Sequence, residues 1–375
     1  MTKKTRLSNI ELLRVISMLM ILGLHVNFFS NGWPEPDNVF TATGMQCMFF
    51  EHLCFGAVNL FVLISGWFGI RANIKGFLNL IWMVMFFMAI YISYCVATGS
   101  NLHDHRMWLG LLGICGGGGW FTASYIGLYI ISPILNAFID SASMKKLVCV
   151  LAVFYGYEVI WGATSSAGFF INGYSMTSFI ALYLLAAALR RSDLRPSKLT
   201  CFGIFIGCVL TNGILHSLSV YYGIRPASAL FTGYYSPFLV IGPAALLLMF
   251  AEIKPFGATA SKVINWFSAS SFAVYLFHCG CGNPVFVDIF KEQASTIFQR
   301  YSGIDYMWRI IGFMLGVYMA ATVLDQVRIA VWKHLLGPAA GRLQAGCRPL
   351  WSAALSGHEP EQGIYGTIRS RIILF

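Results

Sequence analysis

Three ionisable residues stand inside a stretch of the chain that is otherwise apolar enough to cross a membrane. The stretch runs from Ser8 to Phe29 and contains Glu11, Arg14 and His25. About 20 apolar residues in a helix span the hydrocarbon core of a bilayer. An ionisable side chain at that depth is costly unless it meets a partner or a water-filled cavity. These residues therefore predict a functional cavity inside a membrane bundle.

The spacing of these residues places them on one helix face at two depths. At about 100° per residue, Glu11, Arg14 and His25 share a narrow sector with Met18. At a rise of about 1.5 Å per residue, His25 lies roughly 16 Å further along the helix than Arg14. The alternative interpretation is an arginine that snorkels to the interface and a histidine whose hydrogen bonds are satisfied by a neighbouring helix.

The combination of an arginine and a histidine suits acyl transfer. A neutral imidazole can take a proton from a hydroxyl group or accept an acyl group. A guanidinium suits a phosphate group or a polarised carbonyl. A long acyl donor with an anionic head group, arriving from the cytoplasm, would span the distance between Arg14 and His25.

Four other ionisable residues lie in or beside apolar segments. We expect Glu51 and His52 to form an interfacial pair that faces water, and we expect His216 to be interfacial as well. Glu158 sits within a predicted span, so its burial requires a partner. The sequence leaves His25 and Arg309 open as that partner.

Uncharged polar residues and one charged pair are expected to hold helices together. Asn59 and Ser65 lie deep enough to hydrogen-bond between helices. Asp325 and Arg328 are most simply a local pair three residues apart on one helix.

Cysteines are numerous, but they predict neither a metal site nor a disulfide framework. The sequence contains ten cysteines, most of them within apolar runs, where a thiol behaves as a small hydrophobic group. His278, Cys279 and Cys281 stand close together, yet no second pair of ligands follows at a spacing typical of zinc sites. We therefore expect no metal.

Composition identifies a polytopic membrane protein. Hydrophobic residues make up 57% and charged residues 11% of the 375 residues, whereas soluble domains contain about 25% charged residues. The net charge of +10 comes from Lys and Arg in short clusters between apolar spans, which is where membrane topology places them. Nucleic-acid binding is therefore excluded.

Hydropathy predicts an all-α polytopic bundle of about ten transmembrane helices. Threading these spans alternately puts most Lys and Arg on one side, so both termini are expected in the cytoplasm and the chain is expected in the cell membrane. Residues 1–335 should form one transmembrane domain. Residues 336–375 mix Pro, Gly and charge, and should form a poorly ordered cytoplasmic tail. The predicted spans cover residues 8–29, 46–69, 76–97, 119–138, 146–163, 174–190, 199–218, 232–251, 263–282 and 307–331.

Four segments carry a resemblance to a known family. They are NIELLRVISMLMILGLH at 9–25, LFVLISGWF at 60–68, WFTASYIGLYIISPIL at 120–135 and SFAVYLFH at 271–278. In this order they resemble the family-3 membrane acyltransferases of the O-antigen acetylase type, whose first helix carries an Arg and a His eleven residues apart. The resemblance covers most of the first 330 residues.

The resemblance implies transfer of an acyl group, usually acetyl from acetyl-coenzyme A, to a hydroxyl of an extracytoplasmic or lipid-linked glycan. His25 would be the catalytic histidine, and Arg14 a donor-binding or electrostatic residue. The family commonly carries Arg-x-Arg after the second helix. Here Arg71 is the direct match and Asn73 replaces the second arginine, so Lys75 would supply the missing charge; an alternative role for these cations is to anchor the cytoplasmic turn.

Whether the histidine acts as a general base or is transiently acylated stays open. So does a second function class, a proton-coupled transporter or flippase for a sugar or lipid-linked substrate, in which Arg14, His25 and Glu158 form a proton relay. The expected partners are the lipid bilayer, an acyl-coenzyme A and a glycan acceptor. Further residues expected to shape the site are Glu11, Glu158, Ser65, Trp120, Tyr125 and His278.

Overall fold

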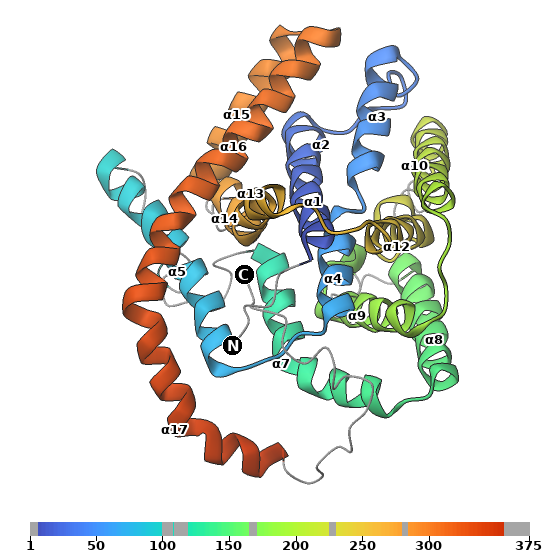
Figure 1. Ribbon diagram of the computed structural model, residues 1–375. Coiled ribbons are helices and arrows are strands. Elements are labelled where there is room, and N and C mark those ends of the chain that lie inside the picture. Colours follow the sequence, from blue (N-terminus) through green and yellow to red (C-terminus); the bar gives the residue numbers. More distant parts are fainter. Residues whose placement is uncertain are drawn as a thin grey trace.

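The computed structural model describes residues 7–99, 108, 119–164, 171–224, 230–279 and 284–355. Within these ranges the regular elements are helices, which confirms the predicted all-α class (Figure 1). Seven helical runs are long and apolar enough to cross a membrane. They are Ser8–Asn31, Ala42–Phe68, Ile74–Thr98, Gly119–Ser141, Lys198–Tyr221, Leu230–Ala251 and Gly303–Gly346.

The three remaining predicted spans fall on other helices. One corresponds to α8 (Met144–Thr164), and a second to α9 (Met176–Arg191), which has only 16 residues. The third is divided into α13 (Ala258–Ala269) and α14 (Ser271–His278) by a break at Ser270. A hydropathy window registers an apolar run but not such a break, so it merged these two helices into one span.

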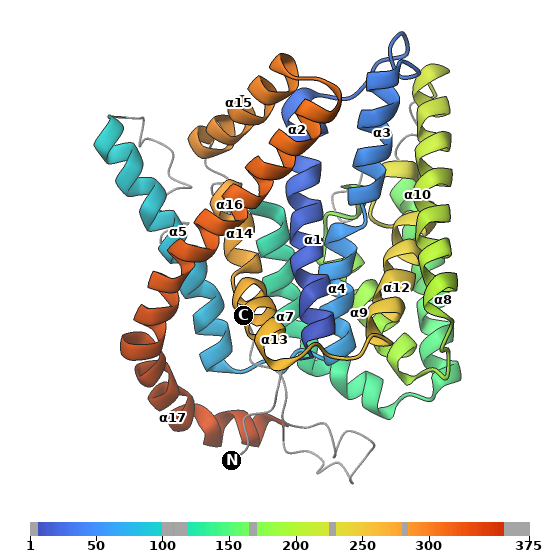
Figure 2. The same ribbon diagram turned by 45° about the horizontal axis from the view of Figure 1, so that its top comes forward.

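Helix α1 (Ser8–Val26) lies in the middle of the bundle (Figure 2). It contacts helices from both halves of the chain. Apolar residues surround α1 on nearly all sides, as is typical of a helix buried within a bundle. A side chain on α1 is therefore placed to meet residues that are distant in sequence. The contacted helices are α3 (Ala42–Cys54), α4 (Ala57–Phe68), α12 (Pro237–Ala251), α13, α14, α15 (Pro284–Arg300) and α16 (Gly303–Val331).

Close packing of α4 on α9 depends on one glycine. A Cβ atom at Gly66 would lie 2.5 Å from the backbone oxygen of Tyr183 and 3.0 Å from the Cβ of Ala186. Because backbone cannot move aside as a flexible side chain can, a larger residue at this position would force the two helices apart. Gly66 thus sets the distance between α4 and α9.

The chain continues as helix beyond the last predicted span. After α16, a π-helical turn at Trp332–Leu336 leads into α17 (Gly337–Leu355), which lies across one end of the bundle (Figure 2). Helix α17 contacts α5 (Ile74–Thr98), and the backbone N–H of Lys75 donates to Oε1 of Gln344 at 3.0 Å. Ala, Leu, Arg and Gln in this segment favour helix. Residues 337–355 are thus helical, residues 356–375 lie outside the described part, and the expectation of a poorly ordered tail stays a prediction.

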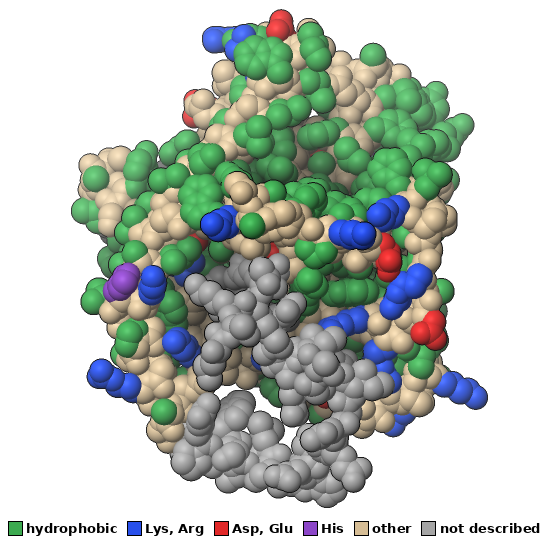
Figure 3. Space-filling view, in the orientation of Figure 1, with side chains coloured by type: hydrophobic (Ala, Val, Ile, Leu, Met, Phe, Trp, Pro, Cys, Tyr) green, Lys and Arg blue, Asp and Glu red, His purple; other side chains and the backbone are tan. Residues whose placement is uncertain are grey.

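Basic side chains are numerous on the face of the molecule that Figure 3 shows. Figure 3 shows Lys and Arg spread over the face that also carries the connection between α12 and α13. The turn between α4 and α5 lies at the same end of the bundle as the start of α1 (Figure 2). The His25 end of α1 is the opposite end.

Candidate functional site

His25 occupies the last turn of α1, and the helix ends at Asn27, whose side chain is hydrogen-bonded to α3. The next residue but one, Asn27, leaves helical geometry with φ −96° and ψ −107°. Its amide Nδ2 donates to the carbonyl of Cys47 and to Oε2 of Glu51, both at 2.8 Å. The end of α1 is thereby fixed against α3, and the backbone that carries His25 is held in place.

A chain of hydrogen bonds sets the tautomer of His25. Its Nδ1 lies 2.7 Å from Nε2 of His278, and Nδ1 of His278 lies 2.6 Å from the carbonyl oxygen of Val274. A carbonyl only accepts, so Nδ1 of His278 carries a proton. When both rings are neutral, Nε2 of His278 must accept the proton on Nδ1 of His25. Nε2 of His25 is then an unprotonated lone pair, as a general base requires.

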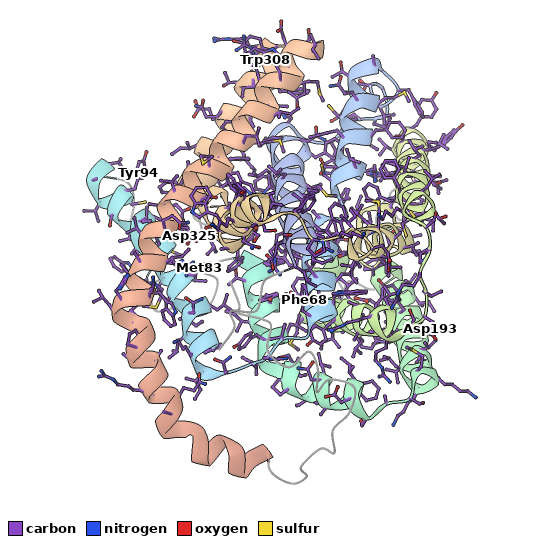
Figure 4. The ribbon with its side chains drawn as sticks, viewed as in Figure 1. Phe68, Met83, Tyr94, Asp193, Trp308 and Asp325 are labelled. Atoms are coloured by element: carbon purple, nitrogen blue, oxygen red, sulfur yellow. The ribbon has the colours of Figure 1, made fainter. Side chains whose placement is uncertain are left out.

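Helix α14, which delivers His278, is fastened at both ends. The hydroxyl of Tyr91 on α5 donates to the backbone oxygens of Leu276 and Phe277 at 2.8 Å and 2.6 Å. At the other end, Ser270 donates to Oδ2 of Asp325 at 2.8 Å, where α16 passes α14 (Figure 4). These bonds position the His278 ring for its contact with His25.

A cavity of about 340 Å³ opens beside His25. Pockets for small molecules range from about 300 to 1,000 Å³, so this one suits a small ligand. Most of its surface is aromatic or aliphatic, and its described lining contains no Asp, Glu, Lys or Arg. The lining residues are Met18, Ile21, Leu24, His25, Phe29, Val58, Phe61, Gly119, Trp120, Phe121, Tyr174, Tyr234, Phe272, Tyr275, Cys279 and Val287.

Arg14 lies outside this cavity. Its Nε is 3.4 Å from Oε2 of Glu11, three residues earlier on the same helix. Its charge also acts electrostatically on the hydroxyl groups of Tyr125 and Tyr318. The cavity reaches Met18, which lies one turn of α1 above Arg14. The structure thus brings Arg14, Glu11 and Tyr125 together and places Met18 between them and the His25 cavity.

Ser65 joins the Arg14 neighbourhood through Tyr125. The two hydroxyl oxygens are 3.2 Å apart, and Ser65 also bonds the carbonyl of Phe61 at 3.0 Å. This contact links α4 to α7 (Gly119–Ser141). Ser65 therefore makes the hydrogen bond between helices that its position predicts.

Arg71 is exposed on the turn between α4 and α5, and Lys75 is exposed in the first turn of α5, at the end of the bundle opposite His25 (Figure 2). The turn is firmly held. Asn136 donates to the carbonyl of Ile70 at 2.8 Å, and the N–H of Ile70 donates to the hydroxyl of Tyr183 at 2.7 Å. The structure separates these cations from His25 by the length of the bundle.

Glu158 takes no part in the His25 site, and neither suggested partner is correct. Its carboxylate accepts a hydrogen bond from Ser178, because α8 packs on α9. Arg309 instead stacks on two aromatic rings, 3.9 Å from the centroid of Tyr301 and 4.2 Å from that of Trp308. Trp308 lies near the start of α16 (Figure 4).

Glu51, His52 and His216 are buried, so the expectation that they face water is wrong. Nε2 of His52 lies 3.0 Å from Nδ1 of His216, and Asn212 lies 3.0 Å from the other nitrogen of His52. These contacts join α3 to α10 (Lys198–Tyr221). Polar groups near a helix end can be satisfied by a neighbouring helix as well as by water, and hydropathy does not distinguish the two.

Two other structural expectations are confirmed. Nδ2 of Asn59 donates to the carbonyls of Tyr234 and Leu239, at 2.9 Å and 2.6 Å, and so ties α4 to the start of α12. Asp325 and Arg328 form the expected local pair, with N–O distances of 2.5 Å and 3.0 Å.

Sequence reasoning missed two aromatic residues and one cysteine of the site. Tyr174 and Tyr234 stack on Trp120 in the cavity wall. A local signal does exist, since Asn172-Gly173 and Gly233 mark turns directly before these tyrosines. Cys279 lines the cavity, and its sulfur lies 3.5 Å from Nδ1 of His25.

His25, His278 and Cys279 place their ligand atoms within 4.8 Å of one another, which suffices for a metal ion. His25 supplies the third ligand that sequence spacing alone does not reveal. The two nitrogens, however, are 2.7 Å apart. Nitrogen ligands in a tetrahedral zinc site are roughly 3.3 Å apart, given a Zn–N distance of about 2.0 Å. The distance between the two histidine nitrogens is therefore that of a hydrogen bond and not that of two nitrogen ligands on one zinc ion.

Comparison with known proteins gives one match. A family model described as an acyltransferase domain, family 3, matches residues 7–326, and so covers the whole site described above. No curated protein and no solved structure matches the chain.

Proposed function

Because the chain belongs to acyltransferase family 3 and its helices are those of a multi-pass membrane protein, we propose that it is an O-acetyltransferase. The donor in this proposal is acetyl-coenzyme A on the cytoplasmic side. The acceptor is a hydroxyl of an extracytoplasmic or lipid-linked glycan. The observation that carries the proposal is the hydrogen-bond chain from Val274 through His278 to His25, beside a cavity.

His25 acts as the general base. Its Nε2 takes the proton of the acceptor hydroxyl while the hydroxyl oxygen attacks the thioester carbonyl. The C–O bond forms, the C–S bond then breaks, and the proton on His25 passes to the departing thiolate. Nε2 of His278 accepts a hydrogen bond from the Nδ1–H of His25 and thereby stabilises the imidazolium in the transition state, as the third member of a triad does.

The donor head group belongs at the opposite end of the bundle. Arg71 and Lys75 are exposed there, and Arg14 lies further in with Glu11 and Tyr125 around it. Cations suit the phosphates of coenzyme A, whereas the His25 cavity has no charged residue in its described lining. The extended pantetheine arm passes Met18 and presents the thioester to His25.

The same division supports one orientation in the membrane. Lys and Arg gather at the end of the bundle where α1 starts, and basic loops remain on the cytoplasmic side. The His25 cavity then faces the outer half of the cell membrane. In this orientation an acyl group taken from the cytoplasm reaches a glycan outside it.

The test is mass analysis of surface glycans from cells that carry the wild-type chain, the His25→Ala variant or no copy. We expect a gain of about 42 Da per modified sugar for the wild type, which is the mass of an added acetyl group, and no gain for the other two. The His334→Ala variant is the matched control, because His334 is exposed in the π-helical turn. A normal gain with His25→Ala would overturn the assignment of the base. No gain with the wild type, together with sugar uptake that needs an ion gradient, would favour a transporter.

A further inference from the structure

We infer that Trp120, Tyr174 and Tyr234 form a subsite that stacks a neutral sugar ring of the acceptor. This inference rests on the proposed function and adds to it the chemical class that the cavity takes. The three residues are called the aromatic shelf below.

The rings of the aromatic shelf lie close together, with both tyrosines stacked on Trp120 and tilted by 55° to each other at a centroid distance of 5.1 Å. Trp120 stacks on Tyr174 with a centroid distance of 4.5 Å and an interplanar angle of 29°. It also stacks on Tyr234 at 5.7 Å and 26°. All three residues line the cavity that contains His25. The shelf and the proposed base are therefore parts of one space.

The backbone is bent specifically to bring Tyr174 to this place. Asn172 and Gly173 have positive φ angles of 51° and 75°, and a left-handed conformation is unfavourable for most residues. A Cβ at Gly173 would lie 2.9 Å from the Cβ of Tyr234. The N–H of Tyr234 donates to the carbonyl of Asn172 at 2.9 Å, and Asn59 holds the carbonyl of Tyr234. The shelf is thus fixed by its backbone as well as by ring contacts.

The shelf offers both surfaces that a pyranose needs. A sugar ring has C–H groups on its faces and hydroxyl groups around its edge, and an aromatic face buries the former while tyrosine hydroxyls bond the latter. Tyr174 is 39% exposed, so part of its ring is open to a ligand. The Tyr174 and Tyr234 rings are neighbours, with centroids 5.1 Å apart, so their phenol groups belong to one surface.

The lack of charged residues in the described cavity lining favours a sugar over the adenine of the donor as the occupant. Adenine would also stack on the shelf, but coenzyme A carries several phosphate charges next to it. The described lining of this cavity contains no Lys or Arg, and beside it a single ammonium, that of Lys291, lies over the ring of Phe29 at 4.1 Å from the centroid. The exposed cations Arg71 and Lys75 lie at the other end of the bundle. A ring without charge is therefore the better occupant.

The experiment uses the full chain in nanodiscs with acetyl-coenzyme A and a panel of methyl pyranosides. Two rates are measured, thioester hydrolysis without acceptor and transfer with the best pyranoside. We expect Tyr174→Ala to raise the acceptor KM about tenfold, which is about 1.4 kcal/mol, while the hydrolysis rate reports whether the variant still uses the donor. Tyr174→Phe should keep most of the affinity because the ring remains. Tyr222→Ala is the control, since Tyr222 is 69% exposed outside the cavity.

Saturation-transfer NMR with the same pyranosides reads the stacking without turnover. Ring protons of the sugar should receive saturation from the wild type and lose it with Tyr174→Ala. An unchanged acceptor KM and an unchanged NMR signal would overturn the inference, as would a raised KM for acetyl-coenzyme A alone. If the wild type consumes no thioester but saturates the sugar protons in a Tyr174-dependent way, the proposed function fails while the sugar subsite stands.

Discussion

At the scale of single residues, the catalytic proposal depends on which nitrogen of His25 carries the proton. The bond from His278 to the Val274 carbonyl decides this, because it turns the other nitrogen of His278 into an acceptor. The sequence could identify His25 as a candidate catalytic residue, since a histidine in an apolar helix needs an explanation. It could not predict the His278 contact, which joins residues 253 positions apart.

Replacing His278 should therefore lower kcat without changing the KM for the acyl donor. We expect His278→Ala to reduce kcat about 100-fold, because His25 loses both its tautomer and the partner of its imidazolium form. The acetyl-coenzyme A KM should stay within a factor of two or so by the same reasoning, since uniform donor binding is untouched. His278→Gln should recover part of the loss, because an amide oxygen can accept the Nδ1 proton. Steady-state kinetics of the two variants measure this, and an unchanged kcat in His278→Ala would contradict it.

Replacing Arg14 should instead raise the KM for the acyl donor. A guanidinium presents several donors in a planar fork, whereas an ammonium is a point charge. We expect Arg14→Lys to raise the KM for acetyl-coenzyme A several-fold, with a smaller change in kcat. Titration of the donor at saturating acceptor measures it. A donor KM equal to that of the wild type would show that Arg14 only pairs with Glu11.

At the scale of elements, hydropathy located the helices but not their breaks or their partners. Ser270 divides one predicted span into α13 and α14, and that break is what sets α14 apart as a short helix ending at His278. The same limit explains why His52 and His216 appeared interfacial. A run of apolar residues shows that a helix is embedded, but the satisfaction of its polar groups depends on which helix packs beside it.

The packing of α4 on α9 gives a prediction about stability. Gly66→Ala should destabilise the fold by about 1–3 kcal/mol, because its Cβ would strike the backbone of Tyr183. Gly203→Ala is the matched control, since a Cβ there meets nothing within 4 Å, and Ala favours helix over Gly by up to about 1 kcal/mol. Thermal unfolding in detergent should show a lower midpoint for the first variant only. Equal midpoints would mean that α4 and α9 can separate without cost.

At the scale of the whole molecule, composition and charge pattern were enough to predict an all-α membrane bundle, and four segments in the right order were enough to suggest its family. The aromatic shelf could not be predicted, because Trp120, Tyr174 and Tyr234 come from three separate segments and meet only in the folded chain. The separation of Arg71 and Lys75 from His25 follows from the predicted topology, whereas the aromatic cavity is a property of the fold. One end carries exposed cations, and the other an aromatic cavity with a histidine.

The difference between the two ends of the bundle leads to a prediction about membrane topology. A fluorescent protein fused after Leu355 should fold and fluoresce, because α17 lies at the basic end of the bundle, which we place in the cytoplasm. Alkaline phosphatase fused at the same point should be inactive there. An active phosphatase with a dark fluorescent fusion would reverse the orientation and, with it, the direction of acyl transfer.

The most direct test of the account compares His25→Ala with His334→Ala in sealed membrane vesicles supplied with radiolabelled acetyl-coenzyme A and the glycan fraction of the same cells. Both variants are adjusted to equal amounts of folded protein. The account predicts label in the glycan at the wild-type rate for His334→Ala, and loss of nearly all label for His25→Ala. Equal rates of labelling in the two variants would contradict the claim that His25 performs the chemistry.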